Sequence, residues 1–142
     1  MAERKIRILV DTCVILDLAL NREGFVQQAR ELFALANNGE VDCYISAQSI
    51  PTAYHYIKKY NHSEQITRQI LMIFLDICYS ISMTAKDCLW ALQSPSSDYE
   101  DTILTETANR ENIDTIITRD QKGFKKSTIS VLTPEEFLKK WR

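Results

Sequence analysis

Four aspartates stand where the chain passes from one predicted element to the next. Asp11 and Asp120 each come directly after a short apolar run, at the carboxyl end of a predicted parallel strand, where ligands gather in α/β sheets. Asp98 and Asp101 open a predicted helix that follows a Ser-Pro-Ser-Ser loop. Their spacing along the chain places both carboxylates on one face of the helix's first turns. The four acids are therefore expected to converge.

Carboxylates that converge in this way need a positive partner. Two of them at about 4 Å repel by roughly 4 kcal/mol at an effective dielectric near 20, so an empty cluster would protonate or separate. Oxygen ligands without nearby cysteine or histidine favour Mg²⁺ or Mn²⁺ over zinc. Such ions activate water and neutralise the charge that develops on a phosphodiester. The acids thus predict a divalent metal site that acts on phosphodiesters.

Structural roles compete with this interpretation. Asp98 has the position of a helix cap, Asp101 that of a first-turn acid favoured by the helix dipole, and Asp120 that of a turn residue. For Asp98, capping and catalysis are equally favoured. For Asp11 the structural alternative is weaker, because an acid that closes a buried strand is costly unless it is paired or bound to metal.

Two other acids and two groups of cations complete the polar inventory. Asp17 and Glu100 are expected to point elsewhere on their helices, as solvated acids. Lys58 and Lys59 follow three aromatic residues, a combination that suits single-stranded RNA but is equally typical of a solvated helix face over core tyrosines. A second basic group lies beside Asp120 and is a candidate RNA-binding patch: Arg119, Lys122, Lys125 and Lys126.

Chain length, composition and net charge limit the possible classes of protein. A chain of 142 residues with 45% hydrophobic residues suits one domain over residues 1–142, and a net charge of -2 provides no overall attraction to nucleic acid. The apolar run before Asp11 is too short for a signal peptide or membrane span, so a cytoplasmic protein is expected. The four cysteines show no zinc-ligand spacing. Glycine-rich nucleotide loops are also missing.

Strand and helix patterns alternate along the chain. Helical spacing marks 25–38, ended by Gly39, and 63–78, begun by Ser63, while Thr84 and Thr133 have the positions of further helix caps. β-branched runs predict buried strands at 6–10, 41–46 and 114–118. This alternation predicts an α/β domain with a central, mainly parallel sheet flanked by helices.

Three segments together resemble the PIN-domain family, which includes VapC-type toxins. They are VDTCVILDLALNRE, SDYEDTILTETA and ITRDQKGFKKSTISVLTPEEFL. The resemblance implies a magnesium- or manganese-dependent endoribonuclease, with an antitoxin partner if the protein is a toxin, and a homodimer as a further expectation. It assigns Asp11, Asp101 and Asp120 to the metal, with Asp98 as an auxiliary catalytic acid. Thr12 and Thr118 match hydroxyl positions that support the site through hydrogen bonds.

Two positions depart from the family pattern. Thr52 stands where the family usually has an acid, and Cys13 replaces an asparagine with a poorer hydrogen-bond partner. A loss of metal affinity or rate is the expected consequence. The alternative function is therefore a catalytically degenerate PIN domain that binds RNA or a protein. Retention of the remaining acids favours the nuclease, since a binding module has no physical need for mutually repelling carboxylates.

Overall fold

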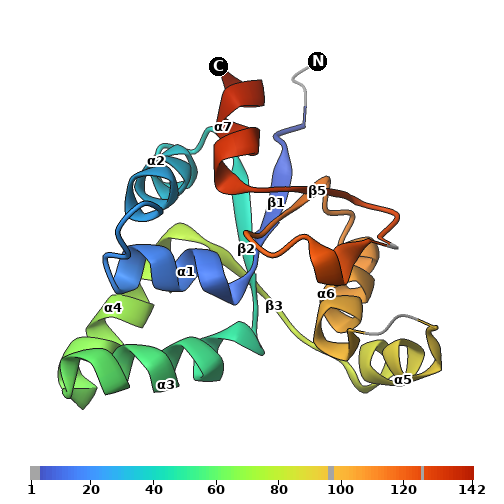
Figure 1. Ribbon diagram of the computed structural model, residues 1–142, viewed down its shortest axis with the longest axis horizontal. Coiled ribbons are helices and arrows are strands. Elements are labelled where there is room, and N and C mark those ends of the chain that lie inside the picture. Colours follow the sequence, from blue (N-terminus) through green and yellow to red (C-terminus); the bar gives the residue numbers. More distant parts are fainter. Residues whose placement is uncertain (1–3, 96–97, 126) are drawn as a thin grey trace.

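A five-stranded parallel sheet forms the centre of the protein (Figure 1). The computed structural model describes residues 4–95, 98–125 and 127–142. The spatial order is β3-β2-β1-β4-β5, and every neighbouring pair is parallel. The predicted fold class is confirmed. The strands are β1 (Arg7–Val10), β2 (Asp42–Ser46), β3 (Tyr79–Ile81), β4 (Thr115–Ile117) and β5 (Ser130–Leu132).

Helices cover both faces of this sheet. One core cluster joins a sheet face to α1, α2, α3, α4 and α7, and a second joins the other face to α6 and a 3-10 turn, η1. Helix α5 packs mainly on α6, away from the sheet. The bounds are α1 (Thr12–Ala19), α2 (Val26–Asn37), α3 (Ser49–Asn61), α4 (Glu64–Ile77), α5 (Ala85–Gln93), α6 (Tyr99–Arg110), η1 (Lys122–Phe124) and α7 (Pro134–Trp141).

The central strand shows why the predicted strands are continuously apolar. Ile8 and Val10 belong to the first core cluster, whereas Leu9 between them belongs to the second. Successive side chains in a strand point to opposite faces, so a strand covered on both sides needs no polar positions. All three side chains are fully buried. The strand therefore ends where the first acid appears, at Asp11.

The predicted helix boundaries agree with the structure to within a residue. Gly39, with φ +75°, ends α2: its N–H donates to the carbonyl of Ala36, and the next N–H donates to that of Leu35. Ser63 caps α4 by accepting a hydrogen bond from the N–H of Ile66 at 3.2 Å. Thr84 and Thr133 each form a reciprocal capping box with an acid three residues on.

Two strands escaped prediction, and both lie at the edges of the sheet. β3 and β5 contain three residues each, and two of the three in β3 are exposed. Edge strands are covered less completely than central ones, so they lack the long apolar run that identifies a buried strand. No helix in the described part of the chain is long and apolar enough to cross a membrane.

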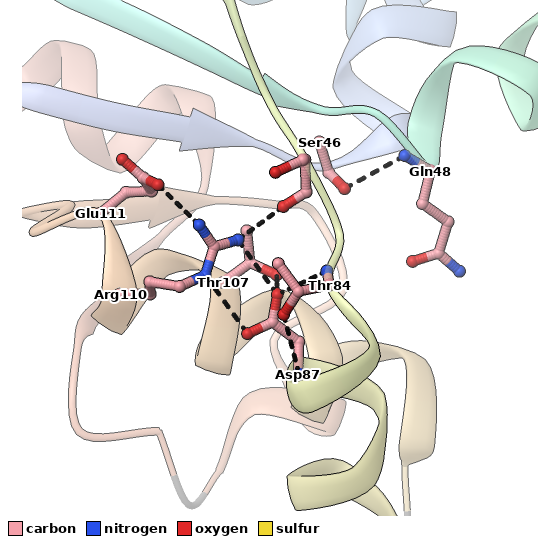
Figure 2. Close-up of polar contacts among 8 residues, drawn as sticks. Ser46, Gln48, Thr84, Asp87, Thr107, Arg110 and Glu111 are labelled. Carbon is pink, nitrogen blue, oxygen red and sulfur yellow. Dashed lines mark hydrogen bonds and ion pairs between the residues drawn. The ribbon is translucent and has the colours of Figure 1, made fainter.

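An ion pair between the buried Asp87 and the partly exposed Arg110 joins α5 to α6 (Figure 2). Asp87, the acid of the Thr84 capping box, accepts hydrogen bonds from Arg110 at 3.0 and 3.4 Å and from Thr107 at 3.4 Å. Burial acts to raise the pKa of Asp87, but the hydrogen bonds from Arg110 and Thr84 outweigh it and hold the pKa below its usual value. The C-terminal end of α6, the helix whose first turn carries Asp101, is thus joined to the start of α5.

Candidate functional site

The first acid of the candidate site is held at the carboxyl end of β1. β1 pairs with β4 so that Val10 faces Ile117, and the N–H of Asp11 donates to the carbonyl of Ile117 at 2.9 Å. Asp11 caps α1: its Oδ1 accepts from the N–H of Thr12 at 2.8 Å, and its Oδ2 accepts from the hydroxyl of Thr118 at 2.9 Å. The carboxylate is therefore fixed from both sides.

Thr118 joins this acid to the predicted one after β4. Its side chain is fully buried, and its Oγ1 also accepts a hydrogen bond from the N–H of Asp120 at 3.1 Å. Asp120 is exposed and accepts from the N–H of Lys122 at 3.3 Å, as in a turn. One hydroxyl thus links the Asp11 carboxylate to the backbone of Asp120, although the two acids are far apart in the sequence.

The other two acids come from the start of α6. Asp98 caps the helix and accepts from the N–H of Asp101 at 3.0 Å. The capping role that competed with catalysis is therefore present, and it does not remove Asp98 from the cluster. The carboxyl groups of Asp98 and Asp101 also share a hydrogen bond that favours the protonated form of Asp101.

The electrostatics show that the four acids act on one another. The pKa of Asp101 rises from 3.8 to about 7, first through burial and then through the charges of Asp98, Asp11 and Asp120. Burial also raises the pKa of Asp11 against the hydrogen bonds from Thr118 and Thr12, and the charges of Asp120 and Asp98 add to the rise. The predicted convergence of the four aspartates is thus present in the structure.

The four aspartates do not form a complete metal-coordination site in the structure. Within the described ranges, no three His, Cys, Asp or Glu side chains are placed so that they could share one metal ion. The donors are nevertheless all carboxylate oxygens, the kind that Mg²⁺ and Mn²⁺ prefer. A cation would also remove the repulsion that raises the pKa of Asp101. The donor chemistry therefore fits such an ion.

Comparison with known proteins assigns the chain to a family. A family model described as a PIN domain matches residues 7–122. The chain belongs to the PIN-domain family. The predicted resemblance is confirmed, and all four aspartates of this PIN domain lie inside the matched segment. A comparison with curated proteins finds no match.

Solved structures share the fold at low identity. A toxin-antitoxin complex from Klebsiella pneumoniae has a TM-score of 0.65 at 26% identity, covering 89% of this chain and 97% of that one. VapBC2 from Rickettsia felis, bound to a DNA fragment from its promoter, has a TM-score of 0.64 at 18% identity with the same coverage. VapC20 from Mycobacterium tuberculosis, a Sarcin-Ricin loop cleaving toxin, has a TM-score of 0.64 at 13% identity, covering 82% of this chain and 92% of that one.

A cavity of about 330 Å³ opens beside the acids of this PIN domain. One wall comes from α3 and includes Thr52, whose hydroxyl donates to the carbonyl of Gln48 at 3.3 Å. The opposite wall comes from α6 and includes Glu100 with Asp101. The prediction that Glu100 points away from the site is wrong, because the first turn of α6 faces the cavity. Glu100 is a fifth acid at the site, although it is exposed.

Asp17 was also predicted incorrectly as a solvated acid. Its side chain is 1% exposed, and it accepts hydrogen bonds from Arg119 at 2.7 and 3.0 Å and from Arg22 at 3.5 Å. Arg119 also lies 3.9 Å from the centre of the Phe25 ring. Its guanidinium is thus committed to holding α1 to the segment after β4. Arg119 was predicted to be a free cation for RNA. Instead, its side chain is bonded to Asp17 and supports the segment that carries Asp120.

The remaining predicted residues are distributed unevenly around the site. Lys122 and Lys125 are exposed, whereas Lys126 lies outside the described residues. Thr12 donates from its hydroxyl to that of Ser49 at 2.9 Å and so links α1 to α3. The Cys13 sulfur lies 3.6 Å from the Thr118 hydroxyl, where it replaces the family's asparagine with a weaker partner.

Sequence reasoning missed Gly123, which lies in η1 directly against the acids. A methyl group added to its Cα would overlap the Asp101 carboxylate and come within 3.0 Å of that of Asp98. Only glycine leaves this space to the two carboxylates. The signal was present as a lone glycine three residues after Asp120, but nothing local distinguishes it from an ordinary turn glycine.

Proposed function

We propose that this PIN domain is a Mg²⁺- or Mn²⁺-dependent endoribonuclease that hydrolyses RNA phosphodiester bonds. The observation that carries the proposal is the pKa of Asp101, raised to about 7 by burial and by three neighbouring aspartates. Acids that repel one another in this way destabilise the folded protein unless a cation joins them. Membership of the PIN family and the cavity beside the cluster add support.

Asp11, Asp101 and Asp120 would hold the ion, with Asp98 as an auxiliary acid. When bound, a divalent cation activates the hydrolytic water and neutralises charge on the phosphate. Asp11 is oriented for this role by Thr12 and Thr118. Asp101, which is about half protonated at neutral pH, releases its proton on binding, so affinity is expected to rise through pH 7.

The partner that the comparisons favour is an antitoxin. Neighbours at similar fold include a toxin-antitoxin complex and a VapBC complex, and on that basis we extend the proposal to a cytoplasmic toxin held by an antitoxin protein. Apolar side chains more than half exposed on α5 provide material for such a contact or for a homodimer: Leu89, Trp90 and Leu92.

A catalytically degenerate PIN domain that binds RNA or protein is the second candidate. The observation that favours it is Thr52, a hydroxyl in the cavity wall where the family usually has an acid. Its Oγ1 is bonded to the backbone of its own helix and does not replace a carboxylate. This candidate predicts that ligands occupy the cavity without metal-dependent cleavage.

Calorimetric titration with Mn²⁺ and Mg²⁺ tests the choice, together with cleavage of structured and single-stranded RNAs. The wild type is expected to bind metal and to cleave, and Asp11→Asn to lose both. Asp76→Asn is the matched control, since Asp76 is an exposed acid on α4 outside the site. Wild type that binds no metal would refute the nuclease. If the wild type binds metal but does not cleave RNA, and Thr52→Glu restores cleavage, the missing acid at position 52 is the cause of inactivity.

A further inference from the structure

Helix α3 leads away from the acid cavity as a line of exposed aromatic and basic side chains. Thr52 and Tyr56 line the cavity itself. Lys59 and Tyr60 follow Tyr56 at the three- and four-residue spacing that keeps helical side chains on one face. Ala53 and Ile57 of the same helix are fully buried in the core. The Tyr56 face therefore points outward and begins at the acids.

Both tyrosines on this face are open to solvent. The exposed fraction is 47% for Tyr56 and 62% for Tyr60. The Tyr56 ring lies edge-on to His55, with centroids 5.3 Å apart. Large aromatic side chains at this exposure leave apolar ring surface in water. A planar ligand that stacked on Tyr56 would cover that surface while remaining next to the acid cavity.

The far end of the same helix is basic. A shallow hollow of about 530 Å³ is lined by Tyr54, His55, Lys58, Lys59 and His62. Lys58 is engaged with Glu64, at 3.3 Å, whereas Lys59 is exposed and forms no ion pair within the described ranges. Cations on the helix that also lines the acid cavity would offset the repulsion between a polyanion and the four aspartates.

We propose that single-stranded RNA is bound along α3, with one base stacked on Tyr56 beside the acid cavity and the adjoining phosphates at Lys59 and the basic hollow. The proposal rests on the proposed nuclease function and names its substrate class and subsite. The hollow carries aromatic and cationic side chains without an aliphatic one, a lining that fits bases and phosphates better than a protein helix. A duplex is disfavoured because its bases are already stacked on one another.

Binding of an RNA of about 12 nucleotides that carries 2-aminopurine tests the subsite. Anisotropy and 2-aminopurine fluorescence would be recorded for the full chain in chelator, which separates binding from metal-dependent cleavage. Tyr56→Ala is expected to weaken binding about five-fold or more and to relieve base quenching, and Tyr56→Phe to behave as wild type, because stacking needs the ring alone. Lys59→Gln should lower the salt slope of log affinity by about 0.7.

Tyr79→Ala is the matched control, since Tyr79 is even more exposed than Tyr56 but lies on the edge strand β3. Equal binding by Tyr56→Ala and wild type would overturn the stacking subsite, even if the wild type cleaves RNA and the nuclease stands. Loss of binding in Tyr56→Ala but not in Tyr79→Ala, without cleavage by the wild type, would support the subsite and refute the nuclease. The subsite would also be overturned if the wild type preferred duplex to single-stranded RNA, or if it bound no RNA at all.

Discussion

Replacing Asp101 by asparagine should stabilise the metal-free protein, and by more at pH 8 than at pH 5. The carboxyl group is destabilised when ionised, because burial and three neighbouring aspartates raise its pKa from 3.8 to about 7. An acid whose pKa is higher folded than unfolded lowers the free energy of unfolding as pH rises between the two values. This loss of stability is complete above pH 7. Asp101→Asn prevents it, because asparagine does not ionise.

The magnitude follows from the same rise in pKa. At about 1.4 kcal/mol for each power of ten, the rise corresponds to about 4 kcal/mol. Asp101 is partly exposed, so solvent screening reduces the expected gain to about 2 kcal/mol at pH 8 and to less than half of that at pH 5. For a chain of this size, 2 kcal/mol raises the midpoint of thermal unfolding by roughly 6 °C.

Thermal and urea unfolding in chelator at both pH values would measure this gain, with Asp76→Asn as the control for removal of an exposed acid. Saturating Mn²⁺ should reverse the order, because the wild type would gain stability from bound metal and Asp101→Asn would gain less. Equal stability of the two proteins at pH 8 would refute the mutual repulsion on which the metal site is argued. So would a gain at pH 8 no larger than that at pH 5.

Three further substitutions test the frame around the acids. Asp17→Asn should destabilise the protein by roughly 3 kcal/mol in urea unfolding, because it removes the anion between two arginines; a change below about 1 kcal/mol would contradict this. Gly123→Ala should weaken Mn²⁺ binding in calorimetry by displacing the Asp101 carboxylate, and unchanged affinity would show that η1 moves aside freely. Arg110→Ala should speed hydrogen exchange throughout α5, since the buried Asp87 loses its cationic partner; exchange equal to wild type would show that apolar packing alone holds α5.

The features that sequence determined are local ones. Ile8, Leu9 and Val10 predict a doubly covered strand because each is apolar, and Asp11 marks its end because a buried carboxylate needs a partner. Gly39, Ser63, Thr84 and Thr133 predict helix ends through hydrogen bonds within a few residues. The four aspartates were found for the same reason, since each stands at a boundary of this kind.

Only the tertiary structure decided which polar groups face each other. Asp17 and Arg119 are separated by 102 residues, so the pattern on one helix could not reveal that both are committed to a buried pair. Glu100 lines the cavity because the first turn of α6 lies opposite α3, and Gly123 matters because η1 contacts Asp101. Burial and neighbouring charge, which set the pKa of Asp101, are sums over elements distant in sequence. Local pattern therefore located the acids, and packing raised the pKa values of Asp11 and Asp101.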